Sequence, residues 1–111
     1  MEKFIESFTK SLSQFADFKG RTGRMEFWYA FAGYLAIYVL ASILSYIPVI
    51  GFIAYLAYLA ALIPTAALFW RRMHDIGKSG LFSLIPLYDL YLAFQVGEST
   101  ENAYGPAVKQ D

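Results

Sequence analysis

The stretch Trp-Arg-Arg-Met-His-Asp-Ile-Gly-Lys-Ser-Gly, residues 70–80, gathers the residue types that could do chemistry. Its Gly-Lys-Ser matches the end of a phosphate-binding loop, but Arg72 stands where the loop needs a glycine, and an apolar helix rather than a strand precedes it. His74 is the single histidine and the chain has no cysteine, which argues against a metal site. No Ser/His/Asp set has a recognisable spacing. We therefore expect no enzyme activity, no cofactor and no metal.

The elements on either side of this stretch are strongly apolar. The chain is 58% hydrophobic and 16% charged, and no Asp, Glu, Lys or Arg lies between Glu26 and Arg71. One helix over this neutral run would be roughly 66 Å long, whereas a bilayer core is about 30 Å thick. Pro48 and Gly51 supply a turn at its midpoint. The pattern predicts a transmembrane helical hairpin over residues 27–47 and 52–70.

The positive residues predict the orientation of this hairpin. They lie on both flanks of the neutral run, whereas the turn carries none, so the positive-inside rule places both flanks and the N-terminus in the cytoplasm. The flanking cations are Lys3, Lys10, Lys19, Arg21, Arg24, Arg71, Arg72 and Lys78. The formal net charge is zero, so no global basic field points to nucleic acid. We expect a multi-pass membrane protein.

Residues 1–20 read as an amphipathic helix. Phe4, Phe8, Leu12 and Phe15 recur every three or four residues among polar ones, which is typical of a helix lying in the membrane interface. The alternative is a short helix packed on a soluble domain.

The third apolar segment, residues 81–96, is 16 residues long and contains Pro86 and Asp89. Its length lies between a full span and a re-entrant piece. We favour a spanning helix, which would put the polar tail, residues 97–111, outside; a bend at Pro86 would return the tail to the cytoplasmic face. Asp89 is then either an intramembrane acid facing protein or water, or a solvated group at the interface.

Residues 71–80 are expected to form a charged cytoplasmic loop with two interpretations. In the first, Arg71, Arg72 and His74 favour the negative end of the preceding helix, Gly77 ends that helix, and Ser79 caps the next segment. Asp75 pairs with the arginines. In the second, five cations from both flanks converge into an anion site suited to lipid headgroups: Arg21, Arg24, Arg71, Arg72 and Lys78. A structural polar cluster is expected from Glu26, His74, Asp75, Ser79 and Asn102.

Small residues recur at helical spacing in both predicted spans. Ala41 and Ser45 form such a pair in the first, and Ala57, Ala61 and Thr65 form a line in the second. Small residues let membrane helices approach closely. We expect them to pack the hairpin, with a homo-oligomer interface as the alternative.

Three motifs, at residues 15–28, 71–80 and 102–106, resemble the signatures of a bacterial inner-membrane family, domain-of-unknown-function family 805, the YhaH-like proteins. The matching positions are Gly20, Arg21, Arg24, Glu26, Trp28, Arg71, Arg72, His74, Asp75, Gly77, Ser79, Asn102, Gly105 and Pro106. The sequence departs from the family pattern at two places. Met73 stands where leucine is usual, and Tyr88 and Asp89 stand where the family tends to have apolar residues and a glycine. The resemblance implies a small multi-pass protein without assigned activity. It also favours a re-entrant third segment, which would let the three motifs meet.

Together these patterns predict an all-α membrane protein. We expect a non-catalytic scaffold or partner subunit whose basic cytoplasmic face binds anionic lipid headgroups or another membrane protein. One alternative is a homo-oligomeric transporter or channel component that uses Asp89; another is a membrane-perturbing toxin.

Overall fold

The computed structural model describes residues 2–108 and residue 110. Its elements are α1 (Glu2–Ser13), α2 (Arg24–Leu44), α3 (Ile50–Asp75), the 3-10 helix η1 (Gly80–Leu84) and α4 (Tyr88–Ala93). Met1 of the expected 1–20 helix lies outside the described residues, as do Lys109 and Asp111 of the 97–111 tail. The described part of the chain is all-helical apart from one isolated bridge between Asn102 and Gly105, so the all-α prediction is confirmed for it.

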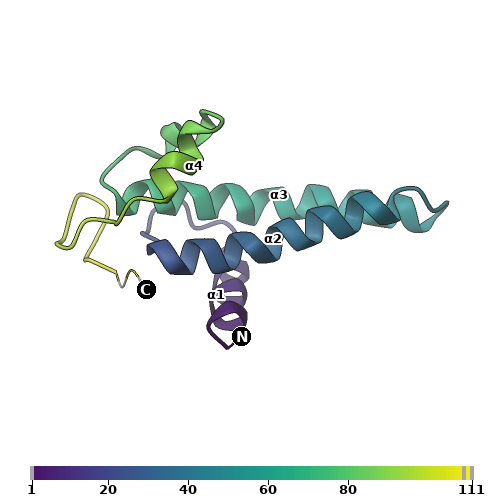
Figure 1. The fold of residues 1–111 in the computed structure, drawn as a ribbon, viewed down its shortest axis with the longest axis horizontal. Coiled ribbons are helices and arrows are strands. Elements are labelled where there is room, and N and C mark those ends of the chain that lie inside the picture. The colour runs from purple at the N-terminus through teal and green to yellow at the C-terminus, as the bar shows by residue number, and fades with distance from the viewer. Residues whose placement is uncertain (1, 109, 111) are drawn as a thin grey trace.

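Helices α2 and α3 form the long antiparallel hairpin that the neutral run predicts (Figure 1). The bounds differ from 27–47 and 52–70: α2 begins earlier, and α3 continues to Asp75. Pro48 stops the first helix because its ring disfavours helical backbone in the residue before it. Gly51 fits the turn because a Cβ there would lie 2.6 Å from the Ser45 carbonyl oxygen. Both helices are long and apolar enough to cross a membrane.

Helix α1 runs across the hairpin instead of along it (Figure 1). Phe8 packs against Gly33, where a Cβ would lie 2.3 Å from the phenylalanine ring. The Ser11 and Tyr34 hydroxyls share a hydrogen bond of 2.8 Å beside it. This packing leaves Leu12 and Phe15 of the predicted apolar stripe exposed, together with Ile5. The helix is shorter than the expected 1–20 because the chain turns at residues 14–16.

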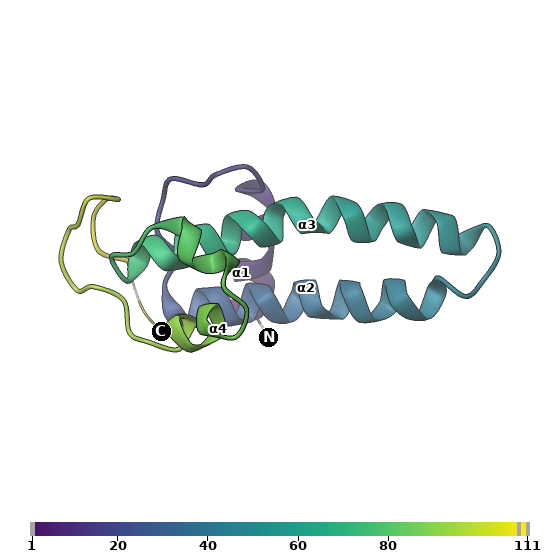
Figure 2. The same cartoon turned by 90° about the horizontal axis from the view of Figure 1, so that it is seen from above.

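The third apolar segment does not form the spanning helix that we favoured. It folds into η1 and the six-residue α4, with a turn at Pro86 and Leu87, whose φ is 66°. Both short helices pack against α3 on the opposite side of the hairpin from α1 (Figures 1 and 2). The proline interrupts the backbone ladder after one short turn, and a six-residue helix covers only about 9 Å.

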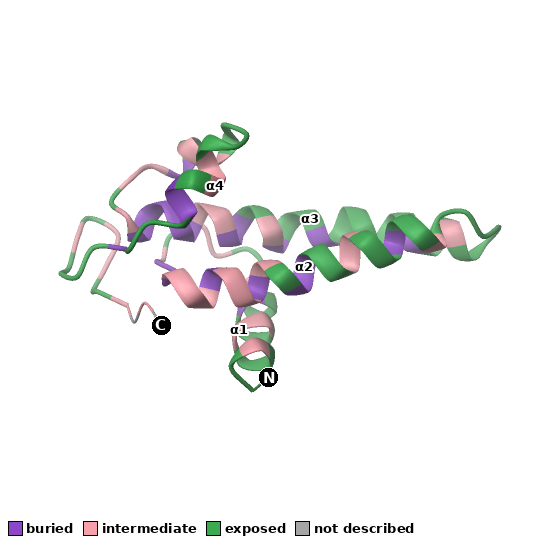
Figure 3. Cartoon of the chain, viewed as in Figure 1, coloured by how far each residue is buried: buried purple, intermediate pink, exposed green. Residues whose placement is uncertain are grey.

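The buried residues gather at the end of the hairpin where α1, α4 and the tail meet (Figure 3). The apolar core there consists of Phe27, Ala30, Tyr34, Leu68 and Ala93. Toward the turn, by contrast, the hairpin is mostly exposed. The exposed apolar side chains there are Leu35, Val39, Leu40, Ile43, Ile47, Val49, Ile50, Phe52, Ile53, Tyr55, Leu56, Leu59, Leu62 and Ile63.

Candidate functional site: a buried arginine–aspartate cluster

The last turn of α3 carries the polar residues of the 70–80 motif. Here Arg71, Arg72, His74 and Asp75 are all buried. The helix ends as the glycine predicts: Gly77 has a φ of 78°, and the Lys78 amide donates to the Met73 carbonyl at 2.9 Å. Ser79 then accepts a hydrogen bond from the Leu81 amide at 3.3 Å. The predicted helix stop and cap are confirmed.

Asp75 stands at the centre of a buried cluster. Its carboxylate accepts from the Arg21 Nε at 2.9 Å and from the Arg72 Nη1 at 2.6 Å. Gln110, near the end of the chain, donates its Nε2 to the same carboxylate at 2.7 Å. The two ion-paired arginine side chains and the aspartate are at most 1% exposed. Burying such charges is costly unless every donor finds an acceptor, so the remaining arginine donors need partners.

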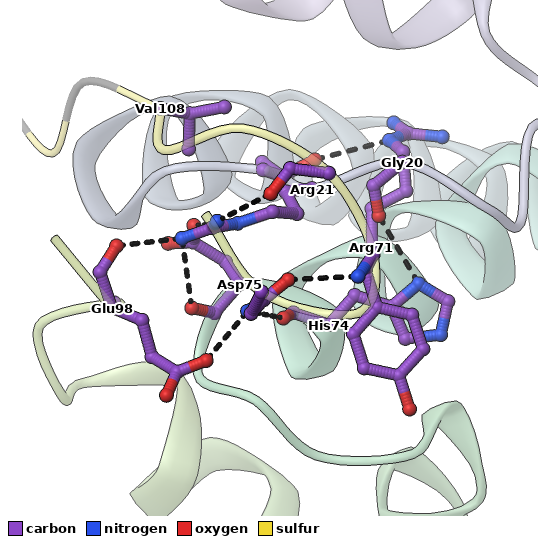
Figure 4. Close-up of polar contacts among 12 residues, drawn as sticks. Gly20, Arg21, Arg71, His74, Asp75, Glu98 and Val108 are labelled. Atoms are coloured by element: carbon purple, nitrogen blue, oxygen red, sulfur yellow. Dashed lines mark hydrogen bonds and ion pairs between the residues drawn. The ribbon is translucent and has the colours of Figure 1, made fainter. Parts of the chain in front are cut away.

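Backbone carbonyls supply those partners for Arg21. Its Nη1 donates to the carbonyls of Thr100 and Gly105, each at 3.0 Å, and its Nη2 donates to the Glu98 carbonyl at 2.6 Å. Figure 4 shows Arg21 lying between Asp75 and Glu98. All three carbonyls belong to the tail after α4, so the tail surrounds this guanidinium.

Carbonyls from both sides of the cluster bind Arg72. Its Nη1 donates to the Thr22 carbonyl at 3.0 Å and its Nε to the Ala93 carbonyl at 3.2 Å, while its Nη2 donates to the Gln95 carbonyl. One side chain of α3 therefore connects the segment before α2 to the end of α4.

Arg71 binds the segment that follows α1. Its Nε donates to the Thr22 hydroxyl at 3.0 Å, and its Nη1 donates to the carbonyls of Gln14 and Asp17, at 2.9 and 2.8 Å. Amides of that segment also bind the Asp17 carboxylate, and the bond from Lys19 at 3.0 Å is the main reason that the pKa of Asp17 is below its usual value.

His74 and the tail form a second set of contacts. The imidazole stacks on the Tyr104 ring at 3.9 Å between centroids, with 4° between the ring planes. Its Nδ1 lies 3.1 Å from the Gly20 carbonyl, as Figure 4 shows. Asn102 donates to the His74 carbonyl at 3.1 Å. The motif at 102–106 therefore meets the one at 71–80.

A glycine lets the tail reach Asp75. A Cβ on Gly97 would lie 1.9 Å from the Asp75 Oδ2, well inside any allowed contact. The Gly97 amide also donates to the Gln110 Oε1 at 2.9 Å. We call the segments that enclose the cluster the polar head: residues 14–23, 71–79 and 94–108, with Gln110.

The structure brings some of the predicted site residues together and separates others. Of the expected anion site, Arg21, Arg71 and Arg72 converge, but their donors point inward to Asp75, Thr22 and carbonyls. Arg24 instead approaches the Phe94 carbonyl at 3.5 Å, and Lys78 lies 5.5 Å from the Phe82 ring centroid. Binding of an anion by these five residues therefore stays a prediction.

The expected structural cluster is also divided. His74, Asp75 and Asn102 meet, whereas Glu26 pairs with Lys10 at 2.9 Å on the surface of α1 and α2. Ser79 serves only as the cap described above. Asp89 lies in the first turn of α4, half-buried, and burial raises its pKa.

Sequence reasoning missed Thr22, Gly97, Glu98, Tyr104 and Gln110 as members of the cluster. Thr22 and Tyr104 lie inside the quoted motifs, which was a usable signal. Gly97, Glu98 and Gln110 lie outside them, and most of their contacts involve backbone groups that no residue type reveals.

The chemistry open to the cluster is limited by its own contacts. The Asp75 carboxylate is shared among three donors, and over residues 2–108 and 110 no group of three His, Cys, Asp or Glu side chains could hold a metal ion. What the arrangement does is join three chain segments that lie far apart in sequence.

The fold and the cluster define a class: a small helical protein with two helices long and apolar enough to cross a membrane, closed at one end by a buried arginine–aspartate cluster. The family model described as "Protein of unknown function (DUF805)" matches residues 15–106, which include all three motifs. The chain belongs to this family, as the motifs predicted. No match was found among the curated proteins or among the solved structures.

Proposed function

We propose that this chain is an integral membrane protein, anchored by the α2–α3 hairpin, that holds the polar head at the cytoplasmic surface of a bacterial inner membrane. The observation that supports it is the apolar exposure of the hairpin. Only 28% of the most apolar stretch of each helix is buried. A core helix of a soluble protein would be mostly buried, and monomeric soluble proteins rarely expose so large a continuous apolar surface.

The helix lengths support the same proposal. Helix α2 has 21 residues and α3 has 26, which correspond to about 31 and 39 Å at 1.5 Å per residue. Both helices are at least as long as a hydrocarbon core of about 30 Å, and α3 exceeds that thickness by about six residues. These are the residues that carry Arg71, Arg72, His74 and Asp75.

Helix α1 and the η1–α4 pair then lie in the interface on either side of the hairpin. The first exposes Ile5 and Leu12, and the second exposes Leu81, Leu84 and Leu87. Apolar side chains on short helices that lie across a hairpin suit the boundary between headgroups and acyl chains. On this proposal the third segment is re-entrant, and Asp89 lies near the interface instead of lining a path across the bilayer.

The role of the head is that of a non-catalytic scaffold or partner subunit. Because Arg21, Arg71 and Arg72 donate to internal acceptors, they hold the head together. Contact with anionic headgroups or with a partner protein then falls to exposed cations around it, such as Lys3 and Lys19.

Cysteine labelling tests the anchor, since the chain has no cysteine of its own. Lys19→Cys in the head and Tyr46→Cys in the turn should react with a membrane-impermeant thiol reagent from opposite sides of sealed vesicles. Both variants should stay with the membrane through alkaline washing. Labelling of both from one side, or recovery of the chain in the soluble fraction, would refute the proposal.

A further inference from the structure

The two faces of the α2–α3 hairpin differ in chemistry. A groove on one face is lined only by aliphatic side chains, among them Leu40, Leu44 and Ile53. A groove on the other face is lined by Ser42, Ser45, Tyr46, Tyr55 and Tyr58. Ala41 and Ala54 line both grooves, so the two lie on opposite sides of the same helix contact. We call the second one the hydroxyl face.

The hydroxyl face separates hydrogen-bond acceptors from donors. On α2, the Ser42 hydroxyl donates to the Tyr38 carbonyl at 2.8 Å and the Ser45 hydroxyl to the Ser42 carbonyl at 2.6 Å. Both serine oxygens therefore keep lone pairs free to accept. On α3, the Tyr55 and Tyr58 hydroxyls donate to no group in residues 2–108 and 110, and the two side chains are 58% and 37% exposed.

Unpaired hydroxyl donors are costly in hydrocarbon, where no water can receive them. Accordingly, and resting on the membrane location proposed above, we propose that the hydroxyl face binds a second copy of this chain, forming a two-fold symmetric dimer within the bilayer. The donors of one copy then bind the acceptors of the other.

Symmetry explains why a second copy fits. A two-fold axis along the membrane normal presents the same face of both copies to each other and keeps every residue at its own depth. When one copy is rotated by 180° about this axis, its α2 helix faces the α3 helix of the other copy. Ser45 lies level with Gly51, whose Cβ would be 2.6 Å from the Ser45 carbonyl oxygen, and Tyr55 follows Gly51 by about one helical turn. Ser42, which lines the same groove about one turn before Ser45, is therefore the serine at the depth of Tyr55, and the tyrosine of each copy meets Ser42 of its partner.

Side-chain size favours the same face. On α2, the exposed Ser42 and Ser45 are small, which allows the backbones of two hairpins to approach closely. The aliphatic face lacks hydroxyl groups, so contact with lipid acyl chains is as favourable for it as contact with another helix. The predicted small pair Ala41 and Ser45 is thus divided: Ala41 is buried within the hairpin, whereas Ser45 is exposed.

Disulfide cross-linking between two singly substituted chains tests the dimer. Chains with Ser42→Cys and chains with Tyr55→Cys, differently tagged, are produced together and oxidised in native membranes; Tyr58 remains as a donor. We expect a mixed disulfide dimer at several times the yield of a matched pair on the aliphatic face, Leu40→Cys with Ile53→Cys. Equal yields, or no dimer from the hydroxyl pair, would overturn the proposal.

A donor deletion provides the second measurement. A hydrogen bond between membrane helices is worth about a factor of three, and symmetry forms each bond twice. Tyr55→Phe should therefore raise the dimer Kd in lipid about nine-fold, measured by energy transfer between labelled copies on dilution with lipid. Tyr91→Phe, an exposed tyrosine of α4, is the control and should leave the Kd unchanged. An unchanged Kd in Tyr55→Phe overturns the dimer, whereas loss of the chain from the membrane fraction would refute the anchor itself.

Discussion

Asp75→Asn should open the polar head. The substitution keeps the shape of the side chain but removes the charge that faces Arg21 and Arg72 at 2.9 and 2.6 Å. Removing one partner of a buried ion pair costs about 3–5 kcal/mol, because the remaining charge stays buried without compensation. At tenfold for each 1.4 kcal/mol, the population with an undocked tail should rise by roughly two to four orders of magnitude.

Limited proteolysis in membranes measures this opening. A glutamate-specific protease can cut the tail at Glu98 and Glu101, and its rate follows the open population when opening is fast relative to cleavage. The cleavage rate in Asp75→Asn should therefore rise at least a hundredfold.

A surface pair provides the comparison. Lys10 and Glu26 lie 2.9 Å apart, but their side chains are 55% and 25% exposed. Such pairs contribute about 0–1 kcal/mol, so Glu26→Gln should change tail cleavage less than tenfold. If Asp75→Asn has no larger effect than Glu26→Gln, the buried cluster does not hold the tail, and the account of the head is wrong.

Other predictions concern close contacts and pH. Gly97→Ala should release the tail as Asp75→Asn does, because its Cβ would lie 1.9 Å from the Asp75 carboxylate; the same protease assay checks it. Gly80→Ala should displace Trp70, because the Trp70 ring would lie 2.0 Å from the new Cβ. The displacement should shift the fluorescence emission of Trp70, measured in a chain whose other tryptophan is replaced by phenylalanine. Since the folded-state pKa of Asp17 is lowered, its contribution to stability is present above the usual value of 3.8 and is lost as pH falls through the folded pKa. Asp17→Asn should therefore lower the temperature of unfolding, followed by tryptophan fluorescence, at pH 7 but have little effect on it near pH 2.

Controls for these variants come from the same elements. Gly105→Ala has open space at its Cβ, so it should release the tail less than Gly97→Ala, although its φ of 132° adds strain. Equal cleavage in the two variants would exclude the steric explanation. An unshifted tryptophan spectrum in Gly80→Ala, or an Asp17→Asn effect that persists in acid, would contradict the contacts described for those residues.

The sequence predicted the hairpin well because its signals are local and strong. A long neutral run with Pro48 and Gly51 at its midpoint allows few other folds, and Gly77 and Ser79 act on their own backbone neighbours. The path of residues 81–96 was harder, since a length of 16 residues suits two paths. The choice depended on Pro86 and on how well α4 packs against α3, which is a tertiary contact.

The direction of the arginines was the part that sequence could not supply. Charge counting places Arg21 and Arg72 at one end of the hairpin, but whether they face lipid or protein depends on acceptors elsewhere. Those acceptors are mostly backbone carbonyls, which every residue has, and they become available only where Gly97 lets the tail approach. The side-chain pattern therefore predicted that the arginines come together, but not that they are buried.

The docking of the tail on Arg21 also has a consequence for biogenesis. The tail carbonyls that complete this guanidinium's surroundings are synthesised some 80 residues after it, so during translation the charge must remain hydrated. On the membrane location proposed above, the hairpin would insert while the motif before it is still unpaired, and this hydrated arginine would help to keep its flank on the cytoplasmic side. Closure of the head then follows insertion, and a chain shortened before Glu98 would insert but never mature.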